Sequence, residues 1–211
     1  MNGRRILAVG DIHGCHAKLV KILSRLDFQP QNGDILVFLG DYIDRGPHSL
    51  EVLETLTELV IRSPGNVVTL LGNHEKMFLD FISGAGMPQL FGAGLASTVR
   101  SFAAGDGEFT QSHMMFLRNL KLYYETDDYI FVHAGLRPGL PLSRQSDNDL
   151  LWIRDDFLNN DYDFGKTIIF GHTPFQEPLV TENRIGLDTG AVFGGPLTAV
   201  VLPERRFIFA D

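Results

Sequence analysis

Five times along this chain, a short apolar run leads directly into a side chain that can bind a metal ion. Runs of this length, set between helical patterns, are typical of buried strands. In open α/β sheets, the loops beyond the carboxyl ends of the strands form the binding crevice. We therefore expect an α/β fold that gathers the following polar residues into one pocket: Asp11 and His13, Asp41, Asn73, His133 and His172.

The hydrophobic pattern also predicts the order of the elements. Helical patterns cover residues 15–26 and 49–62, the second with Ser49 as its N-cap, and another helix should begin near His74. The alternation of strands and helices at the start of the chain predicts a largely parallel, buried sheet. The last three strands are close together, which favours an antiparallel end to the sheet system. The predicted strands span residues 6–9, 34–39, 67–71, 122–125, 129–132, 167–170, 184–187, 197–202 and 207–210.

The length of the chain fits one domain with an insertion. We expect residues 1–211 to form a single catalytic domain. Between residues 83 and 120 glycine and alanine become frequent, and no run has a strand pattern. This stretch is interpreted as a small, mostly helical insertion over one edge of the site.

The composition limits the cellular location and the binding partners that we expect for this chain. The net charge is −8 and no lysine or arginine block is present, which argues against nucleic acid or an anionic membrane as the main partner. Cys15 is the only cysteine, so no intramolecular disulfide can form. No run approaches the roughly 20 apolar residues of a membrane helix, and no signal peptide is visible. We expect a cytoplasmic protein, and the oligomeric state stays open.

The types of ligand indicate the metal. Carboxylate, amide and imidazole groups without a thiolate suit Mn²⁺, Fe or Zn²⁺ better than a cysteine-based structural zinc, and Mn²⁺ is our leading choice. A carboxylate such as Asp41 can bridge two ions, and two ions about 3.5–4 Å apart are a known clamp for phosphoryl transfer. The spacing alone does not say which aspartate bridges.

These residues also lie in motifs that resemble a known family. Together the motifs resemble the signature blocks of the PPP-type (calcineurin-like) metallophosphoesterases, in particular small bacterial and bacteriophage serine/threonine protein phosphatases such as the lambda phage phosphatase. The resemblance extends from residue 10 to about residue 202 and implies a β-sandwich of two mixed sheets flanked by helices, with a small helical insertion. The motifs are GDIHG (residues 10–14), GDYIDRG (40–46), GNHE (72–75), HAG (133–135) and GHTP (171–174).

The resemblance implies a role for each of the metal ligands. Asp11 and His13 would hold one divalent ion, and Asp41 would bridge to a second. That second ion would be completed by three further ligands, namely Asn73, His133 and His172.

Four other roles concern the phosphate and the leaving group. His74 would protonate the leaving oxygen, and Asp44 would orient His74. Arg45 and Arg154 would hold the phosphate oxygens, which Asn73 and His74 also border. By contrast, Glu75 is interpreted as a supporting carboxylate at the start of a helix.

Three functions remain open from the sequence. The leading hypothesis is a serine/threonine protein phosphatase that acts on a phosphoprotein or phosphopeptide, and also on phosphotyrosine and small aryl phosphates. The alternative is a symmetrical bis(5'-nucleosyl)-tetraphosphate hydrolase. Residues 46–47 and 49–53 resemble the corresponding segment of those hydrolases. Asp44 and Glu75 favour the first, because the hydrolases usually differ at both positions. The third is a metal-binding scaffold without catalysis.

Overall fold

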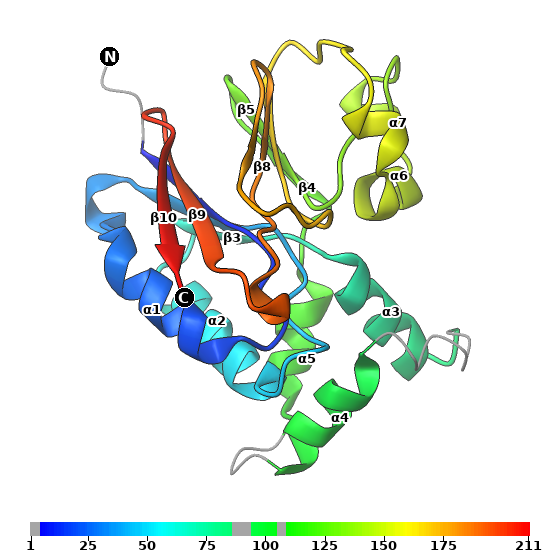
Figure 1. The fold of residues 1–211 in the computed structure, drawn as a ribbon. Coiled ribbons are helices and arrows are strands. Elements are labelled where there is room, and N and C mark those ends of the chain that lie inside the picture. Colours follow the sequence, from blue (N-terminus) through cyan, green and yellow to red (C-terminus); the bar gives the residue numbers. More distant parts are fainter. Residues whose placement is uncertain (1–4, 86–93, 105–108) are drawn as a thin grey trace.

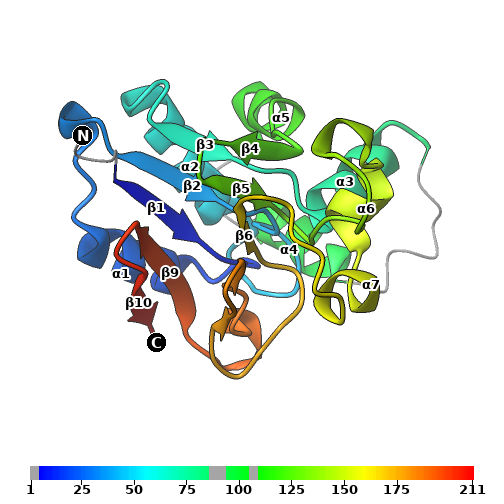
Figure 2. The same cartoon turned by 90° about the horizontal axis from the view of Figure 1, so that it is seen from above.

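The computed structural model describes residues 5–85, 94–104 and 109–211. Two five-stranded sheets pack against each other, and helices cover their outer sides (Figures 1 and 2). Both sheets contain parallel and antiparallel neighbours. The architecture confirms the predicted sandwich of two mixed sheets flanked by helices.

The first sheet is built from both ends of the chain, in the order β10-β9-β1-β2-β3. β1, β2 and β3 are parallel, as the opening pattern predicts. β9 pairs antiparallel with β1 and with β10, so the last two strands form the predicted antiparallel end. The strands are β1 (Ile6–Val9), β2 (Ile35–Phe38), β3 (Val67–Thr69), β9 (Leu197–Leu202) and β10 (Arg206–Ala210).

The second sheet has the order β4-β5-β6-β8-β7, with three parallel strands between two antiparallel edges. The strand predicted at residues 184–187 does not join the antiparallel end of the chain; as β8 it pairs in parallel with β6. β7 escaped prediction because it has only two residues. The strands are β4 (Tyr123–Glu125), β5 (Tyr129–Val132), β6 (Thr167–Phe170), β7 (Leu179–Val180) and β8 (Arg184–Gly186).

Alternation along β1 explains how two layers of core form. Ile6 and Ala8 pack between the sheets, in one buried cluster with Phe131 of β5. Leu7 and Val9 point to the opposite face and join the cluster beneath the helices. Because successive side chains of a strand alternate between faces, a fully apolar strand can serve both layers. Full burial of each large aliphatic side chain is worth about 1.5–3 kcal/mol.

The helices divide between the two sheets. α1 and α2 cover the first sheet, and α5 packs against α2 (Figure 1). α6 and α7 lie beside the second sheet. None of the described helices has the length and apolar character needed to cross a bilayer. The helices are α1 (His16–Leu26), α2 (Ser49–Arg62), α3 (Asn73–Ile82), α4 (Leu95–Ala104), α5 (Gln111–Arg118), α6 (Asp147–Trp152) and α7 (Asp155–Leu158).

The stretch predicted as an insertion supplies α4 and α5, and its residues 86–93 and 105–108 lie outside the described residues. α4 packs against α2 near the start of that helix. The predicted N-cap of α2 is wrong: His48 occupies the cap position and Ser49 is the first helical residue. Ser49 is buried, and its Oγ accepts the backbone N–H of Asp44 at 3.2 Å.

Candidate metal centre and phosphate site

The six predicted metal ligands all lie just beyond the carboxyl ends of strands. They come from both sheets, since three of the strands are β1, β2 and β3 and the other two are β5 and β6. The predicted ligands therefore gather at the edge where the two sheets meet, rather than at one edge of a single sheet. All six side chains are buried, with residues 0–6% exposed: Asp11, His13, Asp41, Asn73, His133 and His172.

Backbone strain is concentrated in these loops. Three ligands have left-handed backbone conformations, with φ of 48° at His13, 52° at Asp41 and 64° at His172. Asp44 and Arg45 follow at 71° and 68°. Residues other than glycine rarely adopt such angles, and each costs on the order of 1–3 kcal/mol. The surrounding contacts must hold these residues in place, which is common at functional sites.

Glu75 is the main internal support of the site. Its carboxylate accepts N–H groups from Asp41 at 2.9 Å, Tyr42 at 2.7 Å, Ile43 at 3.1 Å and Gly72 at 3.1 Å. Burial and the Asp41 carboxylate raise the pKa of Glu75, whereas the N–H donors favour its ionised form. The side chain ties the loop after β2 to the start of α3, as expected of a supporting carboxylate.

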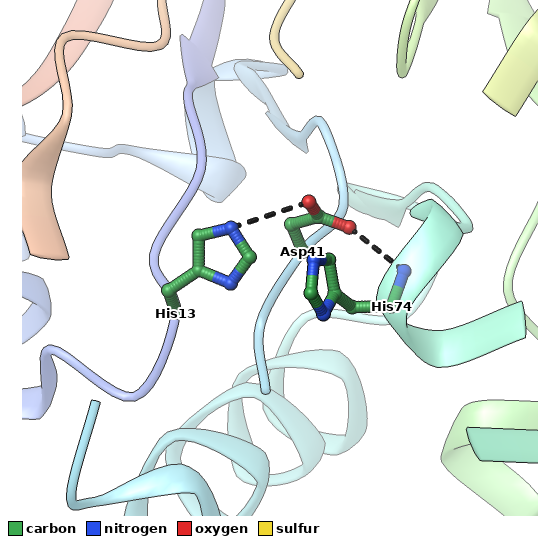
Figure 3. A group of neighbouring side chains, drawn as sticks. All are labelled: His13, Asp41 and His74. Atoms are coloured by element: carbon green, nitrogen blue, oxygen red, sulfur yellow. Dashed lines mark hydrogen bonds and ion pairs between the residues drawn. The ribbon is translucent and has the colours of Figure 1, made fainter. Parts of the chain in front are cut away.

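The Asp41 carboxylate faces two imidazoles on different sides. Its Oδ2 lies 3.3 Å from Nε2 of His13, and its Oδ1 lies 3.4 Å from Nε2 of His133 (Figure 3 shows the His13 side). The Nδ1 atoms of these histidines lie 2.8 Å and 2.9 Å from the carbonyl oxygens of Ile43 and Leu39. A carbonyl can only accept, so each Nδ1 carries the proton of the neutral ring. Each Nε2 therefore carries a lone pair and lies near a carboxylate oxygen.

Two buried acceptors that face each other are satisfied by a proton or a metal ion between them. The Asn73 side chain adds a third group, with Oδ1 placed 2.9 Å from Nε2 of His133 and 3.1 Å from Nδ1 of His172. If the Asn73 amide is rotated so that its oxygen and nitrogen exchange places, its NH₂ group donates to these two imidazole nitrogens instead. The first orientation suits a bound ion, and the second satisfies the imidazoles without one.

Among the described residues, two groups can each hold an ion, and they share Asp41. One consists of Asp41, His13 and His74, and the other of Asp41, His133 and His172, with ligand atoms within 4.8 Å of one another in each. Figure 3 shows the first group. Asp11 lies beside the groups, but its carboxylate oxygens accept the backbone N–H of His172 at 3.1 and 3.0 Å.

The protonation states suit metal ligands. Burial and the neighbouring His133 lower the pKa of His172 to about 3, so its ring is neutral near pH 7. Burial likewise lowers the pKa of His133. Burial alone would raise the pKa of Asp41, but the adjacent imidazoles, His133 and His74 foremost, bring it well below its usual range. Neutral imidazoles and an ionised carboxylate are the ligand forms of these side chains.

Negative charge accumulates around the ligands. Burial and the carboxylates of Asp188 and Asp41 raise the pKa of Asp11 well above its usual range. Asp188, 6% exposed, was missed by the sequence reasoning, although it follows the strand predicted at residues 184–187. The signal used for the other ligands would have found it. Buried carboxylates this close are costly to ionise unless cations offset their charge, so the donor set fits divalent metal ions.

His74 and Asp44 form a buried pair beside the ligands. Nδ1 of His74 lies 2.7 Å from Oδ2 of Asp44, and the two residues are 1% and 2% exposed. The contact brings together His74, which is expected to protonate the leaving oxygen, and Asp44, which is expected to orient His74. Because Asp44 already engages Nδ1, Nε2 is the ring nitrogen of His74 that is left for a substrate.

The two predicted arginines lie at the exposed side of the cluster. Arg45 Nη1 is 2.7 Å from Nε2 of His13, and Arg154 Nε is 3.1 Å from Nε2 of His172. Arg45 thus occupies the lone pair that an ion beside His13 would take, and it must move aside when that ion binds. Two exposed aromatic rings lie close to the cluster. Phe193, 67% exposed, lies 5.4 Å from the Arg45 guanidinium, and Trp152, 40% exposed, lies 6.1 Å from the ring of His172, which Arg154 also contacts.

Comparison with known proteins shows the family to which this chain is similar. The calcineurin-like phosphoesterase family matches residues 4–202. The asymmetrical bis(5'-nucleosyl)-tetraphosphatase PrpE of Geobacillus sp. (strain WCH70) is 31% identical, over 97% of this chain and 93% of its own. A crystal structure provisionally assigned as a diadenosine tetraphosphatase is 25% identical with a TM-score of 0.76, over 98% and 93% of the chains. A serine/threonine phosphatase from Saccharomyces cerevisiae, 18% identical with a TM-score of 0.67 over 99% and 80%, supports the fold alone.

These relatives overturn the leading functional hypothesis. A serine/threonine protein phosphatase with a phosphoprotein substrate is wrong, because the relatives similar over nearly their full length are named as nucleotide tetraphosphatases. They favour the alternative, with asymmetrical in place of symmetrical cleavage. Asp44 and Glu75 misled the reasoning because both act inside the site: one contacts His74 and the other holds backbone N–H groups. Neither contact depends on what lies beyond the phosphate.

The same family implies a dinuclear divalent metal centre, and the buried donors around Asp41 suit one. The matched segment contains every predicted ligand, both arginines and the His74–Asp44 pair. Sequence, fold and site therefore agree on the class of protein. The chain belongs to the calcineurin-like phosphoesterase family.

Proposed function

We propose that this chain, as a single catalytic domain, hydrolyses dinucleoside tetraphosphates asymmetrically to a nucleoside triphosphate and a nucleoside monophosphate. The observation that carries the proposal is the similarity to asymmetrical tetraphosphatases over 97% of the chain. The site is compatible with this substrate because it offers metal ligands, two guanidinium groups and exposed aromatic rings in one region.

Asp41 is the proposed bridging ligand between two ions. Its two oxygens face different imidazoles, so each can bind a different ion. Asp11 and His13 would complete one site, and Asn73, His133 and His172 the other. The oxygen and nitrogen donors favour Mn²⁺, with Fe or Zn²⁺ also compatible. When bound, two such ions supply an activated water and offset the charge of the phosphoryl group.

The arginines would hold the polyphosphate. Arg45 and Arg154 each contact the outer side of one histidine ligand, so a phosphoryl group over the metal centre would lie within reach of both. Guanidinium groups bind phosphate oxygens through paired, charge-assisted hydrogen bonds. Phe193 and Trp152, beside the arginines, provide exposed rings on which a nucleobase can stack, a contact worth about 1–3 kcal/mol per base.

His74 would donate the proton that the leaving phosphate oxygen needs. Its Nδ1 is held by Asp44, so Nε2 is the atom available to the substrate. A carboxylate partner fixes the ring orientation and stabilises the protonated imidazole. General acid catalysis of this kind typically contributes about 10²–10⁴-fold in rate.

A comparison of substrates tests the proposal. The purified protein, supplied with Mn²⁺, would be assayed on diadenosine tetraphosphate, a phosphoserine peptide and p-nitrophenyl phosphate. We expect the highest kcat/KM on the dinucleotide. A higher value on the phosphopeptide would contradict the proposed substrate class. No turnover of any of the three, with metal bound, would instead identify a non-catalytic scaffold.

A further inference from the structure

The first turn of α4 is in contact with the loop that carries Asp44 and Arg45. The backbone N–H of Arg45 is directed at the carbonyl oxygen of Gly94, 3.5 Å away. A Cβ atom at Gly94 would lie 2.9 Å from that nitrogen, and the φ of Gly94 is +113°, a conformation that favours glycine. The helix can approach this closely only because residue 94 has no side chain.

Within α4, the side chain of Thr98 holds Asp44 at two points. Its Oγ1 accepts the backbone N–H of Asp44 at 2.8 Å and donates to the Asp44 Oδ1 at 2.5 Å. Thr98 is fully buried. One hydroxyl thus fixes both the backbone and the carboxylate of a residue whose φ is +71°. The donated bond leaves Oδ2 as the oxygen that contacts His74, at 2.7 Å.

We propose that Thr98 is a positioning residue that acts through Asp44 on His74. The inference deepens the proposed function, since it rests on the roles given there to those two residues. Without the hydroxyl, the Asp44 N–H retains a second acceptor in Ser49 Oγ at 3.2 Å, but Oδ1 loses the Thr98 donor. The carboxylate is then free to rotate, and the imidazole loses its fixed direction.

Thr98 could also serve only to attach α4 to the domain, and Ser101 provides the control for that role. Ser101 lies one turn further along α4, is 7% exposed, and accepts the backbone N–H of Leu50 at 3.0 Å. Its contact joins α4 to α2 without touching Asp44. Loss of this hydroxyl should weaken the helix attachment and leave the acid pair in place.

The test is a double-mutant cycle with the full-length, Mn²⁺-loaded protein. The variants are Thr98→Val, Thr98→Ser, Ser101→Ala, Asp44→Asn and the combination of Thr98→Val with Asp44→Asn. For each, kcat and KM are measured on diadenosine tetraphosphate and on phenyl phosphate, an aryl ester whose leaving group needs a proton, together with the melting temperature. Valine keeps the shape of threonine without the hydroxyl, and serine keeps the hydroxyl without the methyl group.

We expect Thr98→Val to lower kcat by about 10–100-fold with little change in KM, since small misplacement of a catalytic group has effects up to that size. Thr98→Ser should recover most of the loss. Ser101→Ala should lower the melting temperature but not kcat. In the Asp44→Asn background, Thr98→Val should cause no further loss of kcat, because residues that act through one another are not additive.

Three results would overturn the inference: an undiminished kcat in Thr98→Val, an equal loss in Ser101→Ala, or losses that multiply in the combined variant. If Thr98→Val does not fold, Thr98→Ala repeats the comparison with a smaller side chain. Absence of dinucleotide turnover beside turnover of the aryl ester would refute the proposed substrate, and the same kcat ratios on the aryl ester would then decide the role of Thr98.

Discussion

Replacement of Asp41 by asparagine should remove one metal ion rather than both. Asp41 Oδ1 accepts the backbone N–H of His74 at 3.1 Å, so the amide oxygen of the variant should take that position. The NH₂ group would then stand where Oδ2 faces Nε2 of His13 at 3.3 Å and would donate to its lone pair. The ion beside His13 would lose two ligand atoms at once, whereas the amide oxygen would still face His133.

The expected magnitude follows from ligand linkage. An ion present at 100 times its dissociation constant stabilises the folded state by about 2.7 kcal/mol, so two ions contribute roughly 5 kcal/mol. For a chain of this size, 1 kcal/mol shifts the melting temperature by about 2–4 °C. Addition of Mn²⁺ should therefore raise the melting temperature of the parent by roughly 10–20 °C and that of Asp41→Asn by about half as much.

In the metal-free protein, the same replacement should lower the stability of the fold. The adjacent imidazoles bring the pKa of Asp41 well below its usual range, so the ionised carboxylate stabilises the folded state near pH 7 and the neutral amide does not. The two stabilities are compared in EDTA, by melting temperature. Asp80→Asn on α3, which removes a partly exposed carboxylate paired with Lys76, is the matched control and should behave like the parent in Mn²⁺.

The assay for the variant combines metal analysis with thermal melting. After dialysis against buffered free Mn²⁺, the parent should retain two ions per chain and Asp41→Asn about one. Two retained ions, with a parent-like response of the melting temperature to Mn²⁺, would refute the assignment of Asp41 as the shared ligand.

Three further predictions concern metal, acid and substrate contacts. EDTA should abolish turnover, and Mn²⁺ should restore it better than Mg²⁺, which binds imidazole poorly; full activity in chelated protein would contradict the metal centre. His74→Asn should keep its metal and lose about 10²–10⁴-fold in kcat, with a larger loss on phenyl phosphate than on p-nitrophenyl phosphate, and equal losses would exclude His74 as the acid. Phe193→Ala should raise KM for diadenosine tetraphosphate by about 5–150-fold if a base stacks there, while Phe209→Ala, which removes an exposed ring on β10, should leave KM unchanged. An unaltered KM in Phe193→Ala would remove that ring from the substrate site.

The fold class and the gathering of the candidate ligands were predictable because both depend on local sequence. An apolar strand that leads directly into a polar residue reports both burial and position, so the same pattern located Asp11, Asp41 and His133 together. The hydrophobic pattern alone could not assign each strand to one of the two sheets that the resemblance implies, because pairing between distant segments leaves no local signal. For that reason the strand at residues 184–187 was expected in the antiparallel end of the chain, whereas as β8 it pairs in parallel with β6.

Contacts that join distant parts of the chain were beyond the sequence reasoning. Thr98 reaches Asp44 across 54 positions, and only the packing of α4 brings them together. The substrate was misjudged for another reason: the roles proposed for the ligands, His74 and the arginines all concern a phosphoryl group, whatever it is attached to. Residues such as Phe193 and Trp152, whose exposed rings are proposed to contact the rest of a substrate, were given no role by the motifs in which they lie.

The identity of the products is the most direct test of the central claim. Diadenosine tetraphosphate would be incubated with the Mn²⁺-loaded protein, and the nucleotides separated by anion exchange at early times. Asymmetrical hydrolysis predicts ATP and AMP in equal amounts, with no ADP. ADP as the sole product would contradict asymmetrical cleavage, and an unconsumed dinucleotide, under conditions in which p-nitrophenyl phosphate is hydrolysed, would contradict the proposed substrate.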